Sequence, residues 1–159
     1  MKKLLLAGLL SVFAVSANAG SWSYNLSKND FDGDTRSATI KPDGSEIELI
    51  LIKNEDLDSD KKYTVVFTLP LGVLTSDCKL CEVRVIADGK EAEPVKLLAA
   101  SSFKTYFLYS SDEAFVDLFK KNKVVKIQMP TSRNRQNLKE TLTFTQTKPF
   151  NLQELDLAK

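Results

Sequence analysis

Short runs of β-branched and aromatic residues recur at close intervals along the chain, and Asp, Asn, Gly and Pro separate them. This pattern of short runs and turn residues is typical of β-sandwiches and β-barrels, and few segments have the periodicity of a helix. We therefore predict an all-β fold, an antiparallel β-sandwich of about eight strands with one short α-helix. The runs that predict strands cover residues 21–26, 35–40, 47–52, 63–69, 82–87, 95–99, 103–109, 124–129 and 141–145.

Two of these runs predict where the core lies. Residues 47–52 are apolar on nearly both faces of a strand, which indicates a central position in the sheet. In the first run, Trp22, Tyr24 and Leu26 alternate with polar residues and should share one face. Trp22 is the sole tryptophan, and we interpret it as a core anchor in preference to a ligand-stacking residue.

The period changes after residue 109. Ser110 and Glu113 have the spacing of a capping box, and Phe115, Leu118 and Phe119 follow at helical spacing. We expect one short helix here, with its aromatic stripe packed on the sheet. A final helical turn is expected over residues 152–157.

The amino-terminal residues have the pattern of a secretory signal peptide. Lys2 and Lys3 precede an apolar run over residues 4–15, and the small residues of Ala17-Asn18-Ala19 follow. We predict that residues 1–19 are removed and that residues 20–159 form a single domain. The apolar run has about twelve residues, fewer than the roughly twenty of a membrane span, and no comparable run follows. These features predict a periplasmic or secreted protein with no membrane span after signal cleavage.

Charge and composition exclude several classes of function. Without Lys2 and Lys3, 20 basic residues face 21 acidic ones, a net charge of −1, which gives no electrostatic footprint for nucleic acid. The chain contains no histidine, which excludes Ser-His-Asp, Cys-His and histidine-based zinc sites. No pair of carboxyl groups stands out as acid and base. The sequence therefore favours a non-catalytic protein without a cofactor.

The only two cysteines, Cys78 and Cys81, form a Cys-x-x-Cys pair that leads directly into a strand. In an exported protein such a pair most often forms a disulfide, which here would fix the strand that follows in register. A redox centre is the alternative, but it needs the first cysteine at a helix amino terminus. A metal site would need further ligands.

Three polar features lie outside the predicted strands and contain residue types that can bind ions. Asp30–Asp34 and Asp56–Asp60 are rich in carboxylates, but their glycine and glutamate positions do not match a calcium loop, so solvated turns are expected. Arg133 and Arg135 lie in a polar stretch between two strands. They are expected in an exposed loop, with a small anion site as the alternative.

The order of features also resembles two groups of small exported β-sandwich proteins, the VasI-like accessory proteins of type VI secretion and the invasion-associated locus B group. The resemblance implies a periplasmic sandwich without known catalytic residues, whose role is binding or assembly. It spans most of the chain after the signal peptide and rests on Trp22, Asp30–Asp34, Cys78–Asp88, Phe115–Leu118 and Phe150–Leu155.

Together these features predict an exported binding or accessory protein that acts through a protein surface, its partner being another protein of the cell envelope. A thiol-disulfide active protein that uses the cysteine pair is one alternative. An inhibitor of an enzyme is another, and it differs from the first prediction only in its target.

Overall fold

A computed structural model describes residues 19–28, 34–54 and 62–158. The predicted signal peptide, apart from Ala19, and most of the two Asp-rich stretches lie outside these residues. The strands are β1 (Ser23–Ser27), β2 (Thr35–Ile40), β3 (Glu48–Lys53), β4 (Tyr63–Thr68), β5 (Leu74–Thr75), β6 (Leu80–Ala87), β7 (Lys90–Ala99), β8 (Thr105–Leu108), β9 (Val124–Arg133) and β10 (Gln136–Thr145). The helices are α2 (Asp112–Lys121) and α3 (Leu152–Asp156).

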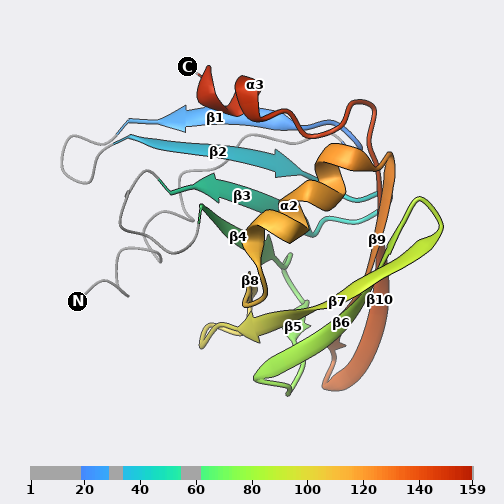
Figure 1. The fold of residues 1–159 in the computed structure, drawn as a ribbon. Coiled ribbons are helices and arrows are strands. Elements are labelled where there is room, and N and C mark those ends of the chain that lie inside the picture. Colours follow the sequence, from blue (N-terminus) through green and yellow to red (C-terminus); the bar gives the residue numbers. More distant parts are fainter. Residues whose placement is uncertain (1–18, 29–33, 55–61, 159) are drawn as a thin grey trace.

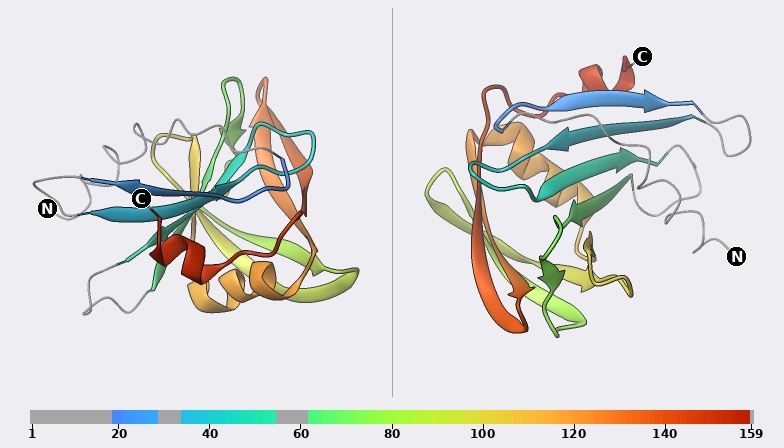
Figure 2. Two further views of the ribbon diagram at one scale, coloured as in Figure 1. Left: turned by 90° about the horizontal axis from the view of Figure 1, so that it is seen from above. Right: turned by 180° about the vertical axis from the view of Figure 1, so that it is seen from behind.

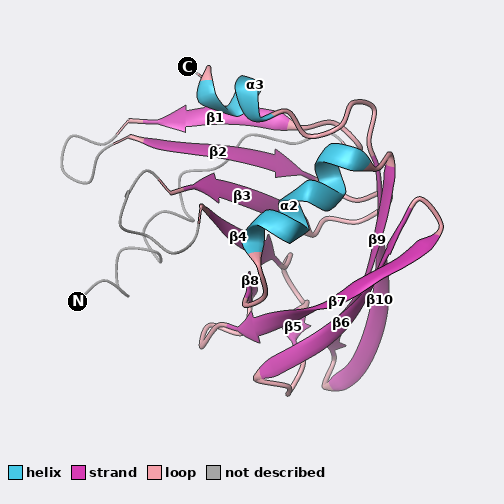
Figure 3. Cartoon of the chain, in the orientation of Figure 1, coloured by secondary structure: helices cyan, strands magenta, loops and turns pink. Residues whose placement is uncertain are grey.

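All ten strands belong to one antiparallel sheet, in the order β1-β2-β3-β4-β8-β7-β6-β9-β10, with β5 paired to β9. The sheet curls so that β1 to β4 form one layer and β6, β7, β9 and β10 the other, and the strands of the two layers run in clearly different directions (Figures 1 and 2). The all-β, sandwich-like fold is therefore confirmed. The layers are joined through β8, and α2 lies across the space between them (Figure 3).

The main core fills the space between the layers. Strand β3 has buried apolar side chains on both of its faces. Leu49 and Leu51 belong to the main cluster, while Ile50 and Ile52 form a second, smaller cluster with Val66 on the other face. The double-sided apolar pattern of this run therefore predicted its burial correctly.

Helix α2 packs its aromatic stripe into the core, as its spacing predicted. Phe119 is fully buried, and its ring makes edge contacts with Phe144 at 5.5 Å and Trp22 at 5.6 Å between centroids. Gln146, which is buried, donates hydrogen bonds to the carbonyl oxygens of Phe119 (3.0 Å) and Asn122 (2.6 Å). These bonds satisfy carbonyl groups that the end of a helix leaves unpaired.

Gly20 connects the segment before β1 to the residues that follow β2 and β10. Its N–H donates to the carbonyl oxygen of Lys41 (3.2 Å), and its own carbonyl accepts from the N–H of Thr147 (2.8 Å). Gly20 has φ +74°, and a Cβ atom at this position would collide with the carbonyl oxygen of Thr145. Only glycine fits here, because the backbone is left-handed and closely approached at the same time.

Candidate functional site

The cysteine pair lies where the chain enters β6. Cys81 is the second residue of this strand and is only 4% exposed, while Cys78 is half-buried in the preceding loop. Their sulfur atoms lie at disulfide distance, with 5.6 Å between the Cα atoms. We call residues 76–79, which connect β5 to β6, the Cys loop.

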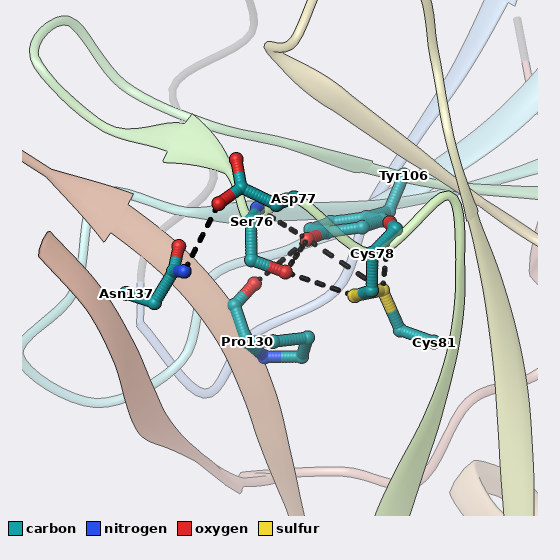
Figure 4. Close-up of a disulfide and its surroundings, with 7 residues drawn as sticks. All are labelled: Ser76, Asp77, Cys78, Cys81, Tyr106, Pro130 and Asn137. Atoms are coloured by element: carbon teal, nitrogen blue, oxygen red, sulfur yellow. Dashed lines mark hydrogen bonds between the residues drawn. A yellow bond between two sulfur atoms is a disulfide. The ribbon is translucent and has the colours of Figure 1, made fainter. Parts of the chain in front are cut away.

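The hydroxyl group of Tyr106 anchors the Cys loop from beneath (Figure 4). This side chain is fully buried; its oxygen accepts a hydrogen bond from the N–H of Ser76 (2.8 Å) and donates one to the carbonyl of Pro130 (2.9 Å). Pro130 lies between the segment of β9 that pairs with β6 and the segment that pairs with β5. Tyr106 therefore binds a carbonyl group at a position where neither β6 nor β5 pairs with β9.

A second connection ties the Cys loop to the β9–β10 hairpin. The side chain of Asn137 donates to the carboxylate of Asp77 (3.1 Å), and β5 pairs with the end of β9 through Leu74 and Ser132 (Figure 4). The Cys loop and the tip of this hairpin consequently lie at the same end of the molecule. We call this the disulfide end.

The surroundings of the cysteines suit a structural pair better than a redox centre. A redox cysteine is activated by a helix amino terminus or a neighbouring cation. Cys81 belongs to a strand and is buried against Tyr106, at 3.9 Å from its hydroxyl oxygen. Neither cysteine lies at the start of α2 or α3, the helices among the described residues.

Arg133 and Arg135 do not come together as one site. Strands β9 and β10 extend further than the sequence predicted, so Arg133 is the last residue of β9, and Asn134 and Arg135 alone form the turn. The expected exposed loop is therefore a tight hairpin, in which Asn134 and Arg135 have φ +49° and +63°. Its polar arms gave a weak strand signal because they extend past the core.

Arg133 lines a cleft of about 520 Å³ together with Leu71, Glu46 and Glu140. Its Nε donates to the carboxylate of Glu140 at 2.8 Å, and Thr131 donates to the same oxygen at 3.1 Å. The hydrogen bond from Arg133 holds the pKa of Glu140 below its ordinary value, and the bond from Thr131 adds to this, while partial burial opposes them. Arg133 is thus already neutralised by an internal carboxylate. Arg135, by contrast, is exposed at the hairpin tip and forms no ion pair with a described residue.

Most of the exposed large apolar side chains lie on segments at the disulfide end, on both faces of the sheet, because Leu138 pairs with Thr131 and Leu74 with its neighbour Ser132. Among the described residues, seven such side chains are exposed, and five of them lie on the segments around the Cys loop. We call these five the apolar rim: Leu71, Leu74, Leu80, Phe103 and Leu138.

Strand pairing and hydrogen bonds link the segments that carry the rim. The N–H of Thr75, next to Leu74, donates to the carbonyl of Phe103 at 2.7 Å. Leu138 lies opposite Thr131 on β9, which in turn pairs with Thr75. Phe103 is 59% exposed and has φ +56°, a conformation that is rare for a bulky residue and that recurs at functional sites.

The rim and Tyr106 were not identified from the sequence. Tyr106 lies within the run 103–109 that was predicted as a strand, and its hydroxyl contacts join segments that are far apart in the chain. A single exposed leucine carries no signal by itself, since much of any protein surface is apolar. The left-handed Phe103 was expected inside a strand, but β8 begins two residues later.

Metal-binding clusters and membrane-spanning helices are absent from the described part of the chain. No group of three or more cysteine, aspartate or glutamate side chains could hold a metal ion there. Within the same residues, no helix has the length and apolarity needed to cross a membrane. The Asp-rich stretches, apart from Asp34, lie outside these residues.

Comparisons with known proteins were made at the level of families, sequences and structures. No protein-family model matches the chain, and no curated protein matches it. Among solved structures, the chain is similar to invasion associated protein B from Bartonella henselae, with 16% sequence identity over 80% of this chain and 86% of that chain and a TM-score of 0.49. The resemblance to this group is one of structure, and the resemblance to the VasI-like group stays a prediction.

Proposed function

We propose that the protein is an exported, periplasmic, non-catalytic binding or accessory protein that acts through the surface at its disulfide end. The observation that carries this proposal is the apolar rim. Five of the seven exposed large apolar side chains among the described residues lie on segments at this one end, and exposed apolar surface that is concentrated in one region marks sites of interaction. Here Leu71 is 91% exposed, and the turn that carries it lies beside Arg133.

The scaffold beneath the rim supports this proposal. The cysteine pair, the Tyr106 hydroxyl and the Asn137–Asp77 hydrogen bond hold the segments that carry the rim at fixed positions. A rigid apolar surface loses little conformational entropy on binding, which favours association. In an interface of this kind, the apolar rim would form the buried centre. The polar groups nearby, including the Arg133–Glu140 pair, would form its solvent-exposed border.

The cysteine pair at disulfide distance also supports export, because disulfides persist in oxidising compartments. The proposed partner is another protein of the cell envelope. An inhibitor of an enzyme would use the same surface on a different target. The alternative of a thiol-disulfide active protein is not favoured, because Cys81 is buried and lies in a strand.

A capture experiment tests the proposal. The purified protein is immobilised and exposed to periplasmic extract, and any partner bound in stoichiometric amount is quantified by mass spectrometry. We expect Leu71→Ser combined with Phe103→Ser to abolish capture. The matched control changes the two exposed large apolar residues away from the rim, Tyr109→Ser with Leu157→Ser, and should capture as the wild type does. Equal capture by both double variants would exclude the rim as the binding surface.

A further inference from the structure

In the described part of the sheet, the edges of β1, β7 and β10 lack a neighbouring strand over part or all of their length. At the β1 end of the sheet, α3 packs against both β1 and β2, and the side chain of Tyr24 accepts a hydrogen bond from the N–H of Asn151, next to this helix (Figure 1). The first half of β7 lacks a neighbour on one side because β8 pairs only with its last three residues. That edge contains a bulge and the exposed Pro94, both of which discourage strand addition.

The third edge, along β10, is open. The carbonyl oxygen of Thr143 accepts a hydrogen bond from the N–H of Asp43 at 2.7 Å, so the backbone of Thr143 points away from β9. Backbone direction alternates along a strand, so Asn137, Lys139 and Thr141 point the same way.

The residue opposite Lys139 confirms this direction. Lys139 faces Pro130 on β9, and proline has no N–H to donate to β10. The carbonyl of Pro130 instead accepts from Tyr106, on the far side of β9. Among the described residues, no backbone hydrogen bond reaches Asn137, Lys139 or Thr141 from that side.

The cleft that contains Arg133 adjoins this open edge. Glu140, Thr141 and Leu142 of β10 line it, opposite the turn that carries Pro70 and Leu71. A strand added along β10 would direct alternate side chains to one face. The cleft therefore offers space to the side chains of such a strand, and Pro70 and Leu71 give it an apolar wall.

Charge decides between a second copy of the chain and a different partner. If two β10 edges paired antiparallel so that all three open residues were matched, Lys139 would face Lys139 of the second copy. Like charges directly opposite each other destabilise a sheet, whereas a carboxylate there would stabilise it. Asp43, Glu46 and Glu140 line the cleft on the other face of β10, so the preference for a carboxylate applies to the position opposite Lys139 and not to the side chains in the cleft.

We propose that the open edge of β10 binds an extended segment of a partner protein as an added antiparallel strand, with a carboxylate opposite Lys139 and apolar side chains in the cleft. This inference rests on the proposed function, because it names how the partner is held beside the apolar rim. Main-chain hydrogen bonds supply affinity in this mode of recognition, and the side chains on alternate positions supply specificity.

A designed peptide tests the inference directly. The probe is a synthetic nine-residue peptide of alternating valine and threonine with a central glutamate, labelled for fluorescence anisotropy. We expect it to bind the purified protein, and Lys139→Pro to weaken binding by about tenfold relative to Lys139→Ala, since only the proline removes the N–H group. A peptide with lysine in place of the glutamate should bind more weakly to the wild type.

N-methylated peptides keep the test independent of any folding defect in the proline variant. Methyl groups on the peptide nitrogens that face β10 should abolish binding, and methyl groups on the alternate nitrogens should not. The inference is overturned if the probe does not bind the wild type, if both methylated peptides bind equally, or if Lys139→Pro binds as Lys139→Ala does. If the inference fails in this way while the rim variants still lose their partner, the proposed function stands without it.

Discussion

Gly20 occupies a position at which the fold does not tolerate a side chain. It combines φ +74° with a position where a side chain would meet the carbonyl oxygen of Thr145. We expect Gly20→Ala to lower the free energy of unfolding by more than Gly44→Ala, because Gly44 has φ +66° but open space around it. The Gly44 change should cost about 1 kcal/mol. Urea unfolding measures both, and equal losses would show that the close contact has no energetic consequence.

Tyr106 should contribute to stability mainly through its hydroxyl group. Tyr106→Phe leaves the N–H of Ser76 and the carbonyl of Pro130 without their partner, and we expect a loss of about 1–3 kcal/mol. Tyr109→Phe is the matched control, because Tyr109 is 60% exposed and its loss should be small. Chemical denaturation of the two variants decides the question. A loss no larger than that of the control would contradict the role given to the hydroxyl.

The pair of Arg133 and Glu140 predicts a dependence of stability on pH. The folded state lowers the pKa of Glu140 below its usual 4.5, mainly through the hydrogen bond from Arg133. This stabilisation is present above the unfolded pKa and is lost as the pH falls through the folded pKa. Glu140→Gln should therefore be less stable than the wild type at pH 7, and the difference should shrink as the pH falls below about 4.5. A difference that stays constant from pH 7 to pH 3 would exclude this linkage.

At the scale of elements, the Cys loop is expected to fix the start of β6. We predict that replacing both cysteines by serine lowers the free energy of unfolding by about 2 kcal/mol, the chain-entropy estimate for so short a loop. The strand content should stay unchanged by circular dichroism. The same loss should appear when the wild type is unfolded in the presence of a reductant, and the double variant should not respond to reductant. A response in the variant would point to a cause other than the disulfide.

The sequence predicted those elements in which the spacing of apolar residues within the element itself indicates which side chains are buried. Residues 47–52 and the stripe of α2 were identified because their periodicity alone distinguishes a buried face. The two-residue strand β5 was missed, since its pairing partner on β9 is distant in sequence, with Leu74 opposite Ser132. The hairpin of β9 and β10 was predicted too short because its arms are polar. The candidate site was predicted only at Cys78, Cys81 and Arg133. The rim and the open edge depend on which segments the curled sheet brings together.

At the scale of the whole molecule, processing of the chain is the main untested expectation. We predict that the protein purified from the cell envelope begins at Gly20, and intact-mass spectrometry can measure this. Cleavage there would leave the new amino group within hydrogen-bonding distance of the Lys41 carbonyl, because the N–H of this residue already donates to it. A start site several residues further along would remove this contact and would contradict the predicted boundary of the domain.

The contacts of Gly20 also bear on how fast the chain can fold. The Gly20–Thr147 and Trp22–Gln146 hydrogen bonds join residues more than 120 positions apart in sequence. Contacts of this separation cannot form until nearly the whole chain is available, and folds rich in them form slowly. A chain that crosses a membrane with its amino terminus first would therefore stay without its final sheet until its last residues emerge.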